Sequence, residues 1–327
     1  MAQTRTSAPQ VSVVVATHNR ERRLSELIAG LRAQTLPAES FEVIVVDDGS
    51  TDGTAMLLER EAEADPRLRP ILAERNAGRA AARERGWRTA RAPLVAFTDD
   101  DCVPDPGWLA AGVAACAAHP GGIVQGATEP NGEELERTSW LRRPFTRTIK
   151  VRSLDPGFAT CNIFYPRELL ERIGGFDVVT YGRVHGSEDA DLAWRAIGAG
   201  GRAAFAPDAI VRHAINWLGP LGTLRLAANW ELRAYADHPG LRRAHFTHRV
   251  FWKASHYLLF RALVALALPR RLRFLAPWLV LPYVRHLIQR GRIEGGGPPI
   301  APFYLLCDLV EMVTVTRAAI RYRTPML

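Results

Sequence analysis

Strand-like and helix-like segments alternate along the first hundred residues. Four short runs predict strands, at residues 11–16, 41–46, 69–72 and 93–97, and the first is the β-branched run typical of a buried strand. After the first run, leucine and isoleucine recur between residues 24 and 31 at the i, i+3, i+4, i+7 spacing of one helix face. This alternation predicts βαβ units with right-handed crossovers, and hence an α/β fold around a mainly parallel sheet.

The alternation becomes irregular beyond residue 124. Residues 131–150 are charged and predict a mobile loop, whereas residues 203–213 contain one or two further strands. From Trp217 onward the pattern is helical, basic and rich in aromatic residues. We therefore expect a flexible N-terminus (1–10), an α/β domain (11–216) and a mostly helical C-terminal extension (217–327).

Polar residues follow three of the predicted strands at the point where each strand ends, in segments 17–20, 47–53 and 99–101. The carboxyl ends of parallel strands meet at one sheet edge, where ligands bind. Strand alternation would turn Asp99 and Asp101 to the same side, and two carboxylates about 4 Å apart repel by roughly 1 to 4 kcal/mol. Mg²⁺ or Mn²⁺ takes such oxygen ligands and commonly bridges phosphates. The alternative is a solvated acidic loop.

Six short motifs occur in order along the chain: 11–19, 45–54, 75–79, 97–104, 174–177 and 188–189. Together they resemble the family 2 inverting glycosyltransferases of GT-A fold, in particular bacterial members with a basic C-terminal extension. The resemblance covers about residues 10–215. It implies a nucleotide-diphosphate-sugar donor, with a UDP- or dTDP-sugar favoured, a divalent metal ion, and transfer of a hexosyl or deoxyhexosyl group with inversion.

The resemblance also implies which residues hold the donor. Thr17, Asn19 and Arg20 belong to the first loop, which contacts the nucleotide. Asp48 matches the carboxylate that accepts a hydrogen bond from the pyrimidine ring N–H. Asn76 and Arg79 match the element beside the nucleotide and its phosphates.

The segment 99–101 matches the D-x-D signature of the family. By this match Asp101 ligates the metal ion, and Asp99 contacts the ribose, a metal-bound water or the metal itself. The middle residue, Asp100, is also acidic, so the match can shift by one position, and Asp100 is included among the donor-binding residues. His213 follows a predicted strand, where many GT-A enzymes have a histidine that contacts the metal or the diphosphate; a purely structural histidine is the alternative.

Departure of the diphosphate and attack by an acceptor hydroxyl require one carboxylate that accepts the hydroxyl proton. Asp189 matches the acidic pair of the family and is the candidate base, with Glu188 as the alternate. Acidic residues in a first helical turn also favour the helix dipole by roughly 0.3 to 1 kcal/mol, which is the structural alternative.

Charge is distributed unevenly within a net charge of +8. Residues 217–327 contain 16 Lys and Arg against five Asp and Glu, whereas the preceding residues carry a net −3. Basic side chains among apolar and aromatic ones favour helices that lie in an anionic membrane interface. The alternative is a helical subdomain that packs on the catalytic domain or forms a dimer. No recognised nucleic-acid motif accompanies the charge, so we expect no nucleic-acid partner.

The remaining sequence features concern the cellular setting and competing functions. Four cysteines form no C-x-x-C pair, residues 1–10 lack the apolar core of a secretory signal, and the apolar stretch 274–284 is too short to span a bilayer. We expect a cytoplasmic protein, peripheral on the inner face of the cell membrane, whose acceptor hydroxyl is lipid-linked or belongs to a small natural product.

Two other functions compete with sugar transfer. One is a nucleotidyltransferase, which needs a glycine-rich phosphate loop that segment 17–20 lacks. The other is a non-catalytic nucleotide-sugar-binding protein.

Overall fold

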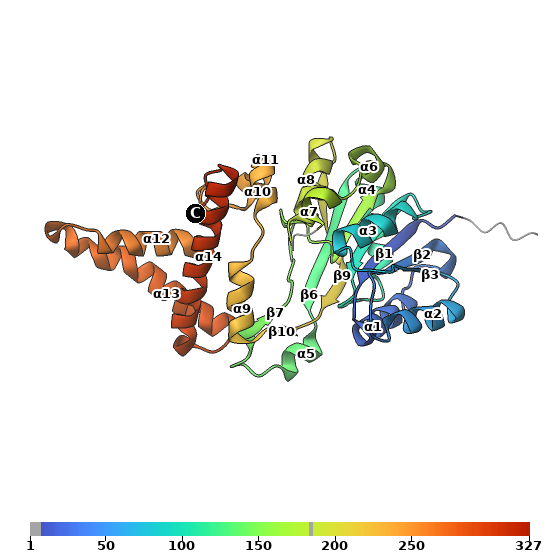
Figure 1. The fold of residues 1–327 in the computed structure, drawn as a ribbon, viewed down its shortest axis with the longest axis horizontal. Helices are drawn as coiled ribbons and strands as arrows, with labels where there is room; N and C mark the ends of the chain where they lie inside the picture. The colour runs from blue at the N-terminus through green and yellow to red at the C-terminus, as the bar shows by residue number, and fades with distance from the viewer. Residues whose placement is uncertain (1–7, 183–185) are drawn as a thin grey trace, which may run out of the picture. The chain divides into compact units, whose positions relative to one another are not determined.

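The computed structural model describes residues 8–182 and 186–327. Residues 1–7, most of the predicted flexible N-terminus, lie outside the described residues. The chain divides into two compact units: the first contains Met1–Gly132 and Thr148–Ala214, and the second contains Glu133–Arg147 and Ile215–Leu327. Each unit is described separately below, and Figure 1 follows the chain through both.

The first unit is built on a sheet that has eight strands among the described residues, in the order β3-β2-β1-β4-β8-β6-β9-β5. Their bounds are β1 Val11–Thr17, β2 Phe41–Asp47, β3 Leu68–Leu72, β4 Leu94–Asp99, β5 Cys102–Pro104, β6 Ile123–Pro130, β8 Asn162–Pro166 and β9 Ala203–His213. Strands β1 to β4 pair in parallel, as do β6 and β9, whereas β8 and β5 run antiparallel to their neighbours. The expected α/β fold with a mainly parallel sheet is confirmed.

Helices cover both faces of this sheet, as Figure 1 shows. Their bounds are α1 Glu21–Arg32, η1 Ala38–Ser40, α2 Thr54–Ala64, α3 Arg79–Arg88, α4 Trp108–Ala118, α6 Arg167–Ile173, α7 Val178–Tyr181 and α8 Glu188–Gly198. Val13 and Val15 of β1 join the apolar core that α1, α2 and α4 cover, whereas Val14 joins the core under α3, α6 and α8. Continuous apolar runs predict strands buried on both faces, and β1 and β2 have this burial.

The register of the central strands brings three loops to one level. Thr17 at the end of β1 lies opposite Asp47 at the end of β2, and Ala16 lies opposite Asp99 at the end of β4. The segments that follow these residues therefore start side by side at the same sheet edge, as predicted from the parallel pairing.

Residues 131–150 do not form the predicted loop. They contain α5 (Gly132–Arg137), η2 (Arg143–Phe145) and β7 (Thr146–Arg147), and β7 pairs antiparallel with β10 (Asn216–Trp217). The pairing partner of β7 lies about seventy positions later in the chain, so the local pattern of residues carried no sign of this strand.

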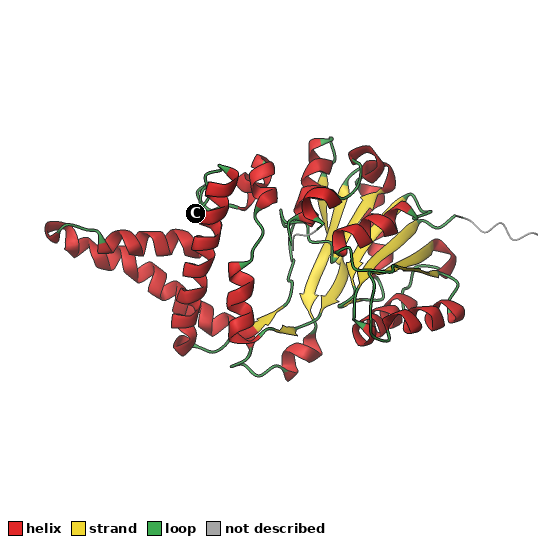
Figure 2. Cartoon of the chain, in the orientation of Figure 1, coloured by secondary structure: helices red, strands yellow, loops and turns green. Residues whose placement is uncertain are grey.

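The rest of the second unit is helical (Figure 2). Its elements are α9 Gly219–Ala228, α10 Arg233–Asp237, α11 Pro239–His245, α12 Ala254–Leu266, η3 Arg270–Leu275, α13 Ala276–Glu294, η4 Pro298–Ile300 and α14 Ala301–Tyr322. None of the helices in the described part of the chain has the length and apolar character needed to cross a membrane.

Candidate functional site

The loops after β2 and β3 lie in direct contact at the carboxyl edge of the sheet. Both carboxylate oxygens of Asp48 accept backbone hydrogen bonds, from the N–H of Ala77 at 2.9 Å and of Gly78 at 2.7 Å. Gly49 and Gly78 have φ of +75° and +94°, and a Cβ on Gly49 would lie 2.7 Å from the backbone of Arg75. Only glycine fits such a conformation at so close an approach. Asp48, predicted to bind the nucleotide base, thus also fixes the shape of the 75–79 loop.

The loop after β1 is tied to both of its neighbours. The Thr17 hydroxyl donates to Asp100 at 2.8 Å, which joins the first loop to the acidic segment after β4. Asn19 has φ +54°; its side-chain oxygen accepts from the Thr51 N–H at 2.7 Å. The backbone N–H of Arg20 donates to the Thr54 hydroxyl at 3.1 Å. Three loops that are distant in sequence therefore form one connected rim.

Arg83, a residue that the sequence analysis did not single out, joins the D-x-D segment to the acidic pair in α8. Its guanidinium lies 2.7 Å from the Asp99 carboxylate and 3.3 Å from each of the Glu188 and Asp189 carboxylates. The Arg83 side chain is 5% exposed, so these contacts are largely shielded from water. The same Glu188 oxygen, Oε1, also contacts Arg79 at 2.6 Å. Two arginines and three carboxylates thus form one cluster.

The charges in this cluster shift the pKa values of its members in opposite directions. Burial alone would raise the pKa of Asp99, but the charge of Arg83 and its hydrogen bond to the Asp99 carboxylate hold the pKa below its usual value. Burial and the adjacent Glu188 carboxylate raise the pKa of Asp189 to about 6, against the opposing effect of Arg83. Burial and the neighbouring Asp101 raise the pKa of Asp100 to about 7.

The two candidate bases occupy different surroundings. Glu188 is 2% exposed and bound by two arginines, and its Oε2 is buried with no hydrogen-bond partner among the described residues. Asp189 is 23% exposed, contacts Arg83 through Oδ1 and accepts the Thr160 N–H through Oδ2 at 3.0 Å. Asp189 is therefore the more accessible carboxylate of the pair.

Asp101 and His213 come together where β5 pairs with β9. Asp101 Oδ1 lies 3.5 Å from His213 Nε2, and the Cys102 sulfur belongs to the same group of possible donor atoms. His213 Nδ1 lies 2.8 Å from the carbonyl oxygen of Ala214, which can only accept, so in the neutral ring Nδ1 carries the proton and Nε2 keeps a lone pair. A carboxylate and an imidazole nitrogen with this tautomer fit a divalent cation such as Mn²⁺.

Three of the residues predicted to bind the donor contact other residues of the chain instead. Asp99 is bound to Arg83, and Arg79 is bound to Glu188. Asn76 is exposed, and its side-chain oxygen accepts the Gly78 N–H at 3.1 Å. The structure therefore places every predicted site residue at or beside the sheet edge, with Asp99 and Arg79 already engaged in ion pairs.

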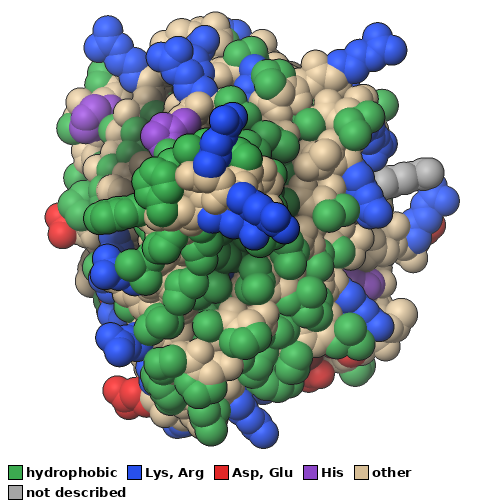
Figure 3. Space-filling view, turned by 90° about the vertical axis from the view of Figure 1, so that its left-hand side faces the viewer, with side chains coloured by type: hydrophobic (Ala, Val, Ile, Leu, Met, Phe, Trp, Pro, Cys, Tyr) green, Lys and Arg blue, Asp and Glu red, His purple; other side chains and the backbone are tan. Residues whose placement is uncertain are grey.

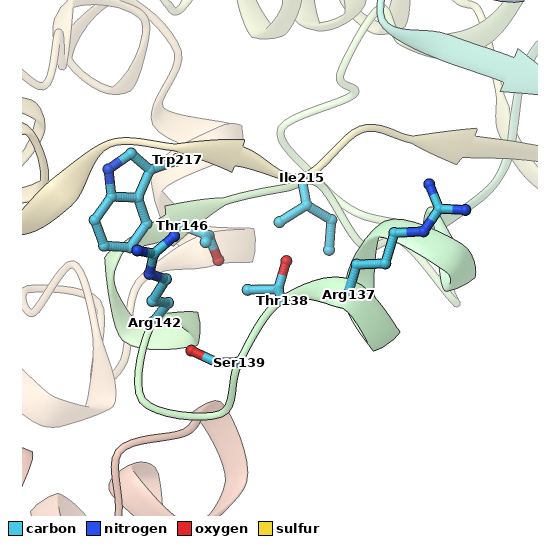
Figure 4. Close-up of a pocket in the computed structure, with 7 residues that line it drawn as sticks. All are labelled: Arg137, Thr138, Ser139, Arg142, Thr146, Ile215 and Trp217. Carbon is cyan, nitrogen blue, oxygen red and sulfur yellow. The ribbon is translucent and has the colours of Figure 1, made fainter.

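A separate pocket of about 400 Å³ lies wholly within the second unit (Figure 4). It is lined by Arg137, Thr138, Ser139, Arg142, Thr146, Ile215 and Trp217. The Arg142 guanidinium lies over the Trp217 ring at 5.3 Å from its centre. None of the predicted donor or metal residues lines this pocket.

Comparison with known proteins gives consistent matches. The sequence profile described as "Glycosyl transferase family 2" matches residues 12–174. The glycosyltransferase AglE of Haloferax volcanii is 30% identical over 220 residues, which covers 65% of this chain and 69% of AglE. Validoxylamine A glucosyltransferase of Streptomyces hygroscopicus subsp. limoneus is 31% identical over 218 residues, 57% of this chain; the chain spans about half, 48%, of that relative's length.

A solved structure extends the similarity over almost the whole chain. The mannosyltransferase PcManGT from Pyrobaculum calidifontis, in complex with GDP-Man and Mn²⁺, superposes with a TM-score of 0.56 at 25% sequence identity. The superposition covers 97% of this chain and 83% of PcManGT. The α/β unit with its helical extension is thus a GT-A-like architecture.

Proposed function

The chain belongs to glycosyl transferase family 2, and we propose that it moves a sugar from a nucleotide-diphosphate donor to an acceptor hydroxyl, with inversion in a single displacement. The observation that carries this proposal is that residues following β2 and β4, at the end of β9 and in α8 lie at one edge of the sheet. There Asp48, Asp101, His213 and the Arg83-linked Asp189 offer contacts for base, metal ion and acceptor.

The donor is bound by the connected rim of loops. Each Asp48 oxygen that accepts a backbone N–H retains a second lone pair, which a base N–H of the nucleotide can use. Uracil and thymine present the same ring N–H, so the proposal favours a UDP- or dTDP-sugar. PcManGT was solved with GDP-Man, which makes a guanine nucleotide the competing donor.

A divalent cation, Mg²⁺ or Mn²⁺, would be held by Asp101 and His213, with Asp99 two residues earlier in the chain at the end of β4. Such an ion supplies positive charge to the leaving diphosphate. The chain's own contribution is to fix the two ligands: Ala214 sets the tautomer of His213, and pairing of β5 with β9 holds Asp101 beside it. Asp99 is oriented by Arg83 and stays ionised because its pKa is lowered.

Asp189 serves as the base that takes the proton from the acceptor hydroxyl. The Thr160 N–H and Arg83 hold its carboxylate in place, and its pKa of about 6 leaves it ionised at neutral pH while it remains basic enough to accept a proton. Glu188, held by Arg79 and Arg83, positions the cluster.

The basic C-terminal region gives the enzyme its location in this proposal. We place the protein in the cytoplasm, peripheral on the inner face of the membrane, where a lipid-linked hydroxyl is accessible. A small natural product is the competing acceptor, as the name of validoxylamine A glucosyltransferase illustrates for that relative.

A donor screen tests the proposal. UDP-, dTDP- and GDP-sugars are incubated with Mn²⁺ or Mg²⁺, and nucleoside diphosphate is measured with and without Asp189→Asn. Glu168→Gln is the matched control, because Glu168 is an 84% exposed carboxylate on α6. We expect diphosphate release from one donor, lost in Asp189→Asn by at least about a hundredfold and retained in the control. A separate reaction with nucleoside triphosphate and sugar 1-phosphate tests the alternative, because pyrophosphate release from that pair would indicate a nucleotidyltransferase. Tight binding of a donor without turnover would indicate a non-catalytic binding protein.

A further inference from the structure

Within the second unit, α12 and α13 form a hairpin joined by η3 (Figure 1). Leu259, Tyr283 and Leu287 are buried against Tyr304 of α14 at its base. A buried polar cluster strengthens that base: Tyr283 donates to Asp308 at 2.9 Å, and Lys253 contacts Glu311 at 2.7 Å. The base of the hairpin is therefore anchored by both apolar packing and buried polar contacts.

The far half of the hairpin has no such cover. Leu266, Phe274 and Trp278 are 79%, 69% and 76% exposed. Further exposed apolar side chains adjoin them: Phe260, Leu263, Val264, Leu272, Leu275, Leu281 and Val284. Figure 3 looks onto this end and shows apolar side chains gathered there with basic side chains among them. A contiguous apolar surface on a protein in water marks an interaction site.

The charge of the hairpin has a single sign up to its last residue, Glu294, which pairs with Arg290. Residues 254–293 contain seven arginines and no aspartate or glutamate. Arg270, Arg271 and Arg273 lie in η3, between the exposed Leu266 and Phe274, and none of them pairs with a carboxylate in the part of the chain that the structure describes. The apolar end of the hairpin is therefore surrounded by uncompensated positive charge.

We infer that the end of this hairpin, residues 263–281, inserts into the interface of an anionic lipid bilayer. Leu266, Phe274 and Trp278 enter the boundary between headgroups and acyl chains, and the η3 arginines contact lipid phosphates. The inference rests on the peripheral membrane association proposed above and assigns the membrane contact to residues 263–281.

Charge complementarity selects the lipid surface over a second copy of the chain. A two-fold interface built on this face would bring two identical sets of η3 arginines together, with no aspartate or glutamate among residues 254–293 of either copy to compensate them. Anionic phospholipid offers the opposite charge and an apolar layer directly beneath it, which matches the order of arginine and apolar side chains on the hairpin.

Vesicle co-sedimentation of the full chain tests the inference. Vesicles of phosphatidylcholine with one quarter phosphatidylglycerol are compared with pure phosphatidylcholine at 50 mM salt. One variant combines Arg270→Gln, Arg271→Gln and Arg273→Gln; a second combines Leu266→Ser, Phe274→Ser and Trp278→Ser. The control combines Arg22→Gln, Arg60→Gln and Arg172→Gln, which removes the same charge from exposed positions of the first unit.

We expect the wild type to bind the anionic vesicles and to be released by high salt. Each basic side chain strengthens partitioning about fivefold, so the η3 variant should lose about a hundredfold and the apolar variant at least tenfold. The control should lose much less than the η3 variant. Donor hydrolysis in solution should be unchanged in all variants, which separates this inference from the proposed transfer reaction.

Three outcomes would overturn the inference. One is absence of binding to anionic vesicles, and another is equal binding by the η3 variant and the control. The third is a wild-type dimer in sedimentation that the apolar variant dissociates while neither protein binds vesicles. That result would identify the face as a contact between two copies of the chain.

Discussion

Replacement of Arg83 by methionine would remove the charge that three carboxylates share. Asp99, Glu188 and Asp189 would remain in place, and Glu188 is only 2% exposed. Methionine fills a similar volume, so the substitution tests the charge of Arg83 more than its packing. We expect a loss of both stability and turnover.

The structure sets the size of the stability loss. Removing one partner of a buried, multiply paired charge costs about 3 to 5 kcal/mol, because the carboxylates left behind are desolvated without compensation. For a unit of this size each kcal/mol lowers the melting temperature by about 2 to 4 °C, so a decrease of roughly 10 °C is expected.

The loss should depend on pH with a defined sign. In the wild type the pKa of Asp99 is lowered in the folded state, which stabilises the fold above pH 3.8 and is lost as the pH falls. In the variant, burial without Arg83 raises the carboxyl pKa values, so the variant loses stability as the pH rises. The difference between the two proteins should therefore be greatest near pH 7 and shrink toward pH 4.

Thermal unfolding at pH 4.5, 6 and 7.5 measures this difference. Arg172→Met is the matched control, since Arg172 is 53% exposed and pairs with exposed Glu168. An exposed pair of this kind contributes about 0.5 kcal/mol or less. If Arg83→Met were no less stable than Arg172→Met at pH 7.5, or if its deficit failed to shrink in acid, the shared-charge account would be refuted.

Three further predictions concern the site and its support. The wild-type kcat/KM should fall about tenfold per pH unit below pH 6, because Asp189 must be ionised, and a flat profile would exclude it as the base. His213→Gln should weaken Mn²⁺ binding at least about tenfold in calorimetry, because even substitutions of residues that only support a metal ligand cause losses of that size. Unchanged affinity would show that the ion binds elsewhere. Gly112→Ala should cost about 1 to 3 kcal/mol in urea unfolding because its Cβ would overlap the Phe164 ring, whereas Gly198→Ala, which meets open space, should not destabilise.

The central fold could be predicted because its determinants are local. Strands β1, β2 and β4 are continuous apolar runs, and their polar ends mark where each strand stops. The antiparallel direction of β8 was not predictable, since its pairing with β4 and β6 depends on how a long connection returns to the sheet. Strand β7, within residues 131–150, was missed for the same reason.

The candidate site was predictable in its residues more than in their partners. Motifs pointed to Asp48, Asp99 and Arg79, but each of them is engaged with another part of the chain. Arg83 was missed although the sequence carried a signal for it. It lies on the same face of α3 as the buried Ala80 and Trp87, where an arginine requires buried partners of opposite charge.

The composition of the cluster explains why Asp189, rather than its neighbour, accepts a proton in the proposed reaction. Asp99, Glu188 and Asp189 carry three negative charges against the two positive charges of Arg79 and Arg83. Glu188 contacts both arginines and Asp99 has the shortest contact with Arg83, so the excess charge falls on Asp189, whose pKa is raised to about 6. Uptake of one proton by Asp189 balances the cluster, and its 23% exposed carboxylate is the one that can receive that proton from an acceptor.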